Sequence, residues 1–370
     1  MLSFTCTSYG SLSGDYFKGV LSTGRNRGMD LIRLSHLHGL TLSAFITALV
    51  PLGCYSPSPN TFSSETLPLV LADSVMLPRE YLGGDIVSLR WLGDSTYVFA
   101  DYITRSLETF HLADTSVYQI GGHGEGPGEY RLPAYVRLGN EGEIVFSDIS
   151  NPRIKFILPD GSQTGVLTHS HGGGRKFDLL EDVVYIQSNE LYLLSAYNRS
   201  GQKLVELFPI DKSYEPFIQR LNGGGVTVIG QSVYAMNSLE PHIYVYNART
   251  RQQIILKPDE WKKYGANFDR NRVEQLSLSN WGEESEDFAF FMDIDKLIFE
   301  QSSALVIFLR YRSRFLLNII SLDGKVLYGS EIEGLWFVGS QQDLLFFVVT
   351  NEDIDKSTLL VYRMIDPNMS

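Results

Sequence analysis

The chain has 370 residues, of which 44% are hydrophobic and 12% aromatic, which is enough for one large globular domain or two ordinary ones. Its formal net charge of −12 argues against a nucleic-acid partner, because a surface this negative repels phosphate backbones. The two cysteines are Cys6 and Cys54, so a disulfide framework and a thiolate metal site are excluded beyond residue 54.

The N-terminal region has the pattern of an export signal. Leu40–Leu52 is an apolar stretch that is too short to cross a bilayer core of about 30 Å but has the length of a signal-peptide core. Gly53 places a small residue directly before Cys54. We therefore expect residues 1–53 to be a signal region, with Met29 as a candidate translation start because the residues before it are rich in Ser and Gly.

Gly53 and Cys54 resemble the lipobox of bacterial lipoproteins, in which the cysteine sulfur is diacylated; Pro51 departs from the Leu that this family usually has there. The resemblance implies lipidation at Cys54 and a place in the cell envelope, anchored to a bacterial membrane and facing the periplasm or the exterior. Plain secretion, with Cys54 incidental, is the alternative. Residues 54–65 are rich in Ser, Pro and Asn, which predicts a flexible tether.

Short β-type runs recur after residue 66, each bounded by Gly, Asn, Asp or Pro. Each unit contains an apolar strand, a polar turn, a second apolar strand and a tight turn. Equivalent positions in successive units are Tyr97, Ile144, Val184, Val233, Val306 and Leu345. Four of the five intervals, of 47, 40, 49 and 39 residues, suit a four-stranded propeller blade of about 40–50 residues.

The six units predict an all-β fold, a six-bladed β-propeller over residues 66–370. The apolar run Leu67–Val75 precedes the first full blade. We expect it to complete the last blade, because such closure removes the exposed sheet edges of an open ring.

The fifth interval, of 73 residues, contains an insertion. Residues 258–281 begin at a proline and carry Trp261, Tyr264 and Phe268 at helical spacing, which predicts a short helical insertion. Its role is left open between a packed surface elaboration and a lid or partner-binding element.

Within Ile120–Gly161, a pattern of glycines, prolines and strand residues consists of Gly122, Gly124, Gly126, Pro127, Gly128, Glu129, Tyr130, Pro133, Asp148, Arg153 and Ile154. This pattern resembles the NHL-like six-bladed propellers common among envelope proteins of Bacteroidetes, many of which have no assigned activity. A dinucleotide-binding loop would need a helix directly after the glycines. Pro127 and Pro133 deny that helix, so Gly121–Gly128 is predicted to cross between blades.

Polar residues recur near the turn between the second and third strands of the units. The candidate ligand-binding residues are Asp101, Arg105, Asp148, Arg153, Asn189 and Asn237. Such turns share one face of a propeller, so these groups could converge on a ligand. The alternative is a turn cap in which the carboxylate bonds local amides and an arginine four or five residues later supports it.

No catalytic or metal-ligating residue is assigned. His169 and His171 lie two apart, which suits metal ligands on a strand, but no third ligand is near in sequence and an exposed pair is predicted instead. Nucleophile-elbow, H-E-x-x-H and Walker patterns are absent from the sequence.

These features predict a binding or scaffolding module of the cell envelope without a cofactor, whose partner is an unknown envelope protein, a peptide or a carbohydrate. It would meet the membrane only through its lipid anchor. The alternative is a metal-dependent lactonase- or hydrolase-like enzyme with calcium at the central channel. A third possibility is a subunit of a larger assembly that docks through residues 258–290.

Overall fold

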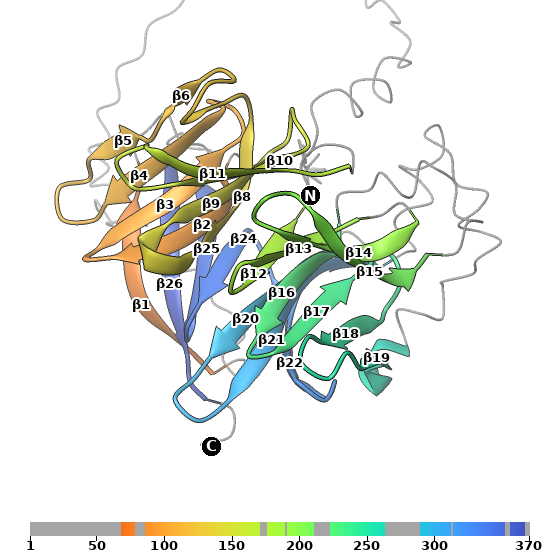
Figure 1. Cartoon of the computed structure of the whole chain (residues 1–370). Helices are drawn as coiled ribbons and strands as arrows, with labels where there is room; N and C mark the ends of the chain where they lie inside the picture. The colour runs from red at the N-terminus through yellow and green to blue at the C-terminus, as the bar shows by residue number, and fades with distance from the viewer. Residues whose placement is uncertain are drawn as a thin grey trace, which may run out of the picture. The chain divides into compact units, whose positions relative to one another are not determined.

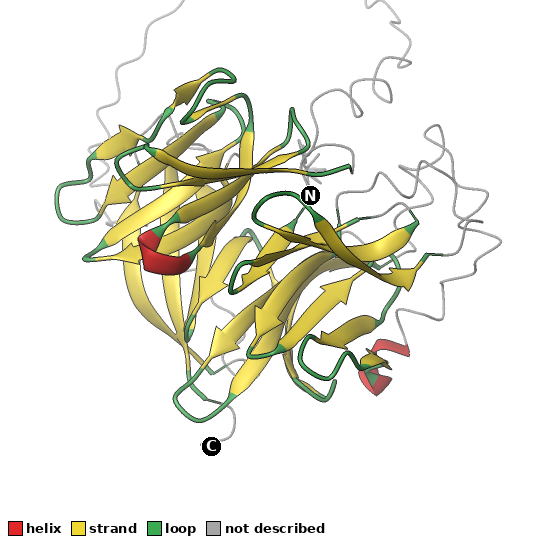
Figure 2. Cartoon of the chain, viewed as in Figure 1, coloured by secondary structure: helices red, strands yellow, loops and turns green. Residues whose placement is uncertain are grey.

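The structure is a computed structural model that describes residues 68–77, 86–170, 176–188, 191–210, 223–262, 289–311, 314–351 and 356–366. All of these belong to the second of two compact units of the chain, Phe62–Ser370. Their regular structure consists of β-strands and two short 3-10 helices, η1 (Asn140–Gly142) and η3 (Asp259–Trp261) (Figure 2).

The strands form six four-stranded antiparallel sheets, one for each blade (Figure 1). Blade 1 contains β2 (Ile86–Gly93), β3 (Thr96–Asp101), β4 (Ser106–His111) and β5 (Val117–Gln119). Blade 2 contains β8 (Pro133–Leu138), β9 (Ile144–Asp148), β10 (Arg153–Ile157) and β11 (Gln163–Thr168). Blade 3 contains β12 (Phe177–Leu180), β13 (Val183–Gln187), β14 (Tyr192–Asn198) and β15 (Lys203–Pro209).

The second half of the ring repeats the arrangement. Blade 4 contains β16 (Gly225–Ile229), β17 (Ser232–Met236), β18 (Ile243–Asn247) and β19 (Gln253–Leu256). Blade 5 contains β20 (Phe290–Ile298), β21 (Ser303–Tyr311), β22 (Arg314–Ser321) and β23 (Val326–Ile332). Blade 6 contains β24 (Trp336–Gln341), β25 (Leu344–Asn351), β26 (Lys356–Met364) and β1 (Leu69–Met76).

The first strands of the blades, β2, β8, β12, β16, β20 and β24, contact one another in order, and β24 contacts β2. They are the inner strands of a closed ring, so the predicted six-bladed β-propeller is confirmed. The six equivalent positions found in the sequence all lie on the second strand of their blade, on β3, β9, β13, β17, β21 and β25.

The N-terminal strand closes the ring, as predicted. β1 pairs antiparallel with β26, with Leu69 opposite Met364 and Met76 opposite Thr358. Blade 6 therefore takes three strands from the end of the chain and its outermost strand from the beginning. The outer edge of blade 6 is thus supplied by the part of the chain that follows the predicted tether.

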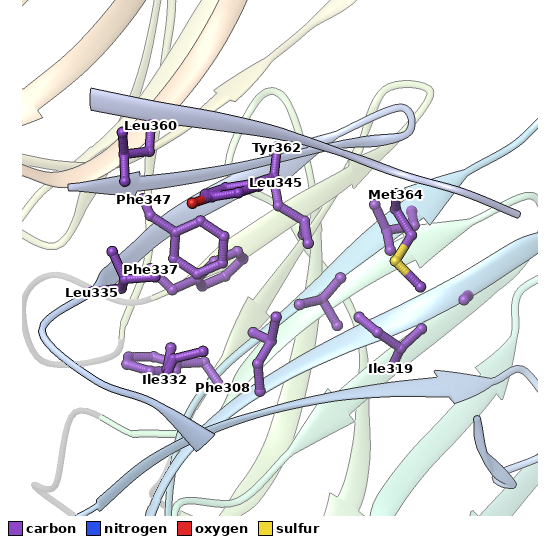
Figure 3. Close-up of a cluster of buried hydrophobic side chains, with 14 residues drawn as sticks. Phe308, Ile319, Ile332, Leu335, Phe337, Leu345, Phe347, Leu360, Tyr362 and Met364 are labelled. Carbon is purple, nitrogen blue, oxygen red and sulfur yellow. The ribbon is translucent and has the colours of Figure 1, made fainter. Parts of the chain in front are cut away.

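The hydrophobic core lies between neighbouring blades. Figure 3 shows the cluster between blades 5 and 6, where the ring centroids of Phe337 and Phe347 are 5.6 Å apart and those of Phe347 and Tyr362 are 5.9 Å apart. Since a second strand is covered on both faces, it need not alternate apolar and polar residues. All five residues of β9 are buried, for example.

The long interval in the repeat falls between β19 and β20, which confirms that it separates blades 4 and 5. Its beginning forms η3, which buries Trp261 with its ring 5.0 Å from that of Phe291. The remainder of the predicted helical insertion, with Tyr264 and Phe268, lies outside the described residues.

The signal region, Cys54 and the tether also lie outside the described residues. No helix within the described ranges is long and apolar enough to span a membrane.

Candidate functional site

The candidate carboxylates of the sequence lie at strand ends and bond the turns that follow. Asp101 ends β3, and its Oδ1 accepts hydrogen bonds from the amides of Ile103 and Thr104, both at 2.8 Å. Asp148 ends β9 and is buried. It accepts hydrogen bonds from four donors, the amides of Arg131, Leu132 and Ser150 and the side chain of Asn151. The bonds within three residues of each aspartate are those of a turn cap, whereas the amides of Arg131 and Leu132 tie Asp148 to the segment before β8.

Among the described residues, the other members of the candidate set share no side-chain hydrogen bond or ion pair with these carboxylates. Asn237 is half-buried and its Oδ1 accepts a hydrogen bond from the amide of Leu239 at 3.0 Å, which is again a local turn bond. Arg105 is exposed, and the described ranges contain no ion pair between Arg105 and Asp101 or between Arg153 and Asp148. Asn189 lies outside the described residues.

The predicted exposed histidine pair is wrong for His169, which is 4% exposed and packs with its ring 6.4 Å from that of Tyr197. His169 directly follows β11 of blade 2 and Tyr197 lies on β14 of blade 3, so this ring contact joins the two blades. His171 lies outside the described residues.

The glycine-rich segment is an inter-blade crossing, as predicted. It leads from blade 1 to blade 2 and contains the parallel pair β6 (Gly122–His123) and β7 (Glu129–Tyr130). A Cβ on Gly121, which has a φ of +71°, would lie 2.3 Å from the carbonyl oxygen of Gly128. The buried hydroxyl of Tyr130 donates a hydrogen bond to the carbonyl of Ile120 at 2.6 Å, which fixes the crossing against blade 1.

A cluster of charged side chains occupies the centre of the ring instead. We call it the channel cluster, and its seven members come from β2, β8, β12 and β20 and from the residue just before β12. They are Arg90, Arg137, Lys176, Asp178, Asp293, Asp295 and Lys296. Inner strands surround the axis of a propeller, so their side chains meet there from blades that are far apart in sequence.

Three ion pairs hold most of the channel cluster. Arg90 Nη2 lies 2.8 Å from Asp295 Oδ2, which joins blade 1 to blade 5. Lys296 Nζ lies 2.9 Å from Asp178 Oδ2, which joins blade 5 to blade 3. The third pair is Lys176 Nζ and Asp293 Oδ1, 3.1 Å apart.

A repeated hydrogen bond also links neighbouring inner strands. In blades 1, 3 and 5, one side-chain oxygen of the inner strand accepts a hydrogen bond from a backbone amide of the next blade. The pairs are Val136 N to Ser88 Oγ at 3.0 Å, Val228 N to Asp178 Oδ2 at 2.7 Å and Ser340 N to Asp295 Oδ2 at 3.0 Å. Both channel carboxylates that make this bond are also paired with a cation.

Burial and mutual charge set the protonation of the cluster. The pKa of Arg90 is lowered to about 10, chiefly by burial and also by the nearby guanidinium of Arg137, while Asp295 opposes the change. Burial alone would raise the pKa of Asp178, but the cations of Lys296 and Arg137 outweigh it and the pKa falls below the usual aspartate value. The carboxylate of Asp178 is thus stabilised in its charged form.

The packing around Arg90 explains a glycine in the neighbouring inner strand. A Cβ on Gly339 of β24 would lie 2.1 Å from Arg90 Nη1 and 2.8 Å from the carbonyl oxygen of Leu89. Only a residue without a side chain lets the guanidinium pass across blade 6 to reach Asp295 in blade 5.

No member of the channel cluster is among the site residues predicted from the sequence. The available signal was a charged residue inside an otherwise apolar first strand, as in IVSLRWLG (86–93) and FFMDIDKLI (290–298). The pairing itself had no local signal, because Arg90 and Asp295 lie 205 positions apart.

Among the described residues, no group of three or more His, Cys, Asp or Glu side chains is arranged to hold a metal ion.

The fold and its centre define a six-bladed β-propeller with an ion-paired channel. No protein-family model matches the chain, and no curated protein matches it. A solved structure of a Bacteroides fragilis protein described as exported is similar, with a TM-score of 0.59 and 14% identity over 83% of this chain and 98% of that one. A member of the duf4221 family from Bacteroides vulgatus is also similar, with a TM-score of 0.53 and 9% identity over 81% and 99%. At these identities the likeness is one of fold.

Proposed function

We propose that this chain is an exported six-bladed propeller that acts as a non-catalytic binding or scaffolding module of the cell envelope. The observation that carries the proposal is the pairing of the carboxylates in the channel cluster and at the blade turns. Asp178, Asp293 and Asp295 are paired with internal cations, while Asp101 and Asp148 bond their turns. The three carboxylates that are paired with a lysine or arginine are poor ligands for a divalent metal ion, because the metal ion would have to displace that side chain.

Export and anchoring rest on the sequence of the N-terminal region. The short apolar stretch, the small residue before Cys54 and the tether suit a lipoprotein of a bacterial envelope, and the exported Bacteroides fragilis protein of similar fold agrees with this location. The ligand in this proposal is an envelope protein, a peptide or a carbohydrate. The lipid at Cys54 would be the contact with the membrane.

Metal analysis of the purified full chain distinguishes this proposal from a metal-dependent hydrolase. We expect no stoichiometric calcium or transition metal by mass spectrometry of the acid-digested protein, and an unchanged Tm when EDTA is added. One bound metal per chain, together with a lower Tm in EDTA, would replace the binding module with the enzyme. If no metal is found, cross-linking in intact cells should identify the partner. Binding of that single envelope component to the purified chain should be saturable.

A further inference from the structure

Arg137 differs from the other cations of the channel cluster because its carboxylate partner, Asp178, is farther away and is also held by Lys296. The other three lie 2.8–3.1 Å from a carboxylate oxygen. Arg137 Nε lies 3.8 Å from Asp178 Oδ1, and the other oxygen of Asp178 is held by Lys296. Arg137 is therefore the cation left over when the carboxylates are assigned to their closest partners.

The hydrogen bonds of Arg137 are also incomplete. Its side chain is 7% exposed, and its Nη1 donates to the carbonyl of Val136 at 3.0 Å. Its Nε is buried and has no hydrogen-bond acceptor among the described residues. A guanidinium carries five N–H donors, and buried polar groups are normally paired.

The charges of the cluster lead to the same residue. Four cations face three carboxylates among its seven members, which leaves one positive charge in excess. Burial by itself would lower the pKa of Arg137, but Asp295, Asp178 and Asp293 raise it above the usual arginine value. The guanidinium thus stays charged, and one monovalent anion would balance the cluster.

We propose that the central channel binds one small carboxylate at Arg137. A carboxylate fits the planar fork of a guanidinium with two parallel hydrogen bonds, which would supply the acceptor that Nε lacks. It brings the single negative charge that the cluster needs. A phosphate would bring a second charge close to three carboxylates, and a halide lacks the second acceptor atom.

Thermal unfolding and calorimetry of the full chain test this site with acetate as the probe. Acetate, phosphate and chloride are compared as sodium salts at equal ionic strength and pH. We expect a saturable rise in Tm with acetate and a 1:1 heat of binding in the wild-type protein. Arg137→Gln should weaken acetate binding at least tenfold, and Arg137→Lys should also weaken it because the charge remains but the fork is lost.

Arg131→Gln is the matched control, since Arg131 is half-exposed and pairs on the surface with Glu125 at 2.7 Å. It should bind acetate as the wild type does. Equal responses to the three salts, a preference for phosphate or chloride, or full acetate binding by Arg137→Gln would overturn the site. If Arg137→Gln does not fold, the wild-type protein alone still tests the site, because the absence of 1:1 acetate binding would also overturn it. These readouts do not depend on a metal or a protein partner, so the site and the proposed function can fail separately.

Discussion

Two regions of the propeller bury carboxylates, and they compensate the charge in different ways. Asp148, at the turn between the second and third strands of blade 2, is 1% exposed and accepts hydrogen bonds from donors up to 17 positions away. Asp295, in the channel, is 2% exposed, and its partners are Arg90 of blade 1 and the amide of Ser340 of blade 6. The turn carboxylate thus shapes one blade, whereas the channel carboxylate holds three blades together.

The largest effect is expected from removing a channel cation that has a carboxylate partner. Arg90→Met leaves Asp295 buried without its counter-charge, and breaking a buried pair in this way costs about 3–5 kcal/mol. Urea unfolding followed by fluorescence gives the free energy of unfolding for this comparison.

The double variant Arg90→Met with Asp295→Leu is the control, because it removes both charges. It should recover much of the stability lost in the single variant. If the double variant is no more stable than Arg90→Met, the unpaired charge of Asp295 does not cause the loss of stability. That result would contradict the difference proposed between the turn carboxylate and the channel carboxylate.

An intermediate effect is expected from Asp178→Asn. The variant keeps the shape of the side chain but loses its charged bonds, and about 1.5–3 kcal/mol is typical for such bonds. Since the pKa of Asp178 is lowered in the folded protein, its contribution is fully present above the ordinary aspartate pKa of about 3.9. It is lost as the pH falls through the lower folded value.

Unfolding free energies measured as a function of pH check this sign. The difference between wild type and Asp178→Asn should be constant from pH 7 to about 5 and should shrink below about 4. A difference that grew on acidification would mean that Asp178 is protonated in the folded channel.

The smallest effect is expected at the turn. Asp148→Ala removes a local cap and should cost about 1–2 kcal/mol, the range for the loss of a capping side chain. Arg153→Ala is the matched control, because Arg153 lies opposite Asp148 in the strand pair without an ion pair to it. It should change stability by less than about 0.5 kcal/mol. Equal losses in the two variants would show that arginine supports the cap after all.

The same contrast explains what the sequence could predict. The second strands, such as LLFFVVTN (344–351), were found because apolar runs and turn residues are local signals. The turn role of Asp148 is predictable for the same reason, since its bonds fall within one repeat. The closing strand was found because a ring fold leaves one apolar run without a blade.

The channel cluster was missed because its meaning is not local. Arg137 and Asp178 interrupt apolar strands, and a charge in a strand usually indicates a solvent-facing position. Only the closure of the ring brings Arg90 to Asp295 and turns these residues inward. Ion pairs between residues this far apart cannot be predicted from the composition of one sequence or from the spacing of its apolar residues.

The strand that closes the ring has a consequence for the order of folding. β1 is synthesised before every other described strand, but its partner β26 is the last to be made. β1 therefore has no sheet to join until β26 is present. Joining the two ends is the most non-local step of the topology, and non-local pairing is slow. Blade 6 is expected to assemble last, and a chain truncated before β26 would leave β25 with an unpaired edge and β1 without a partner strand.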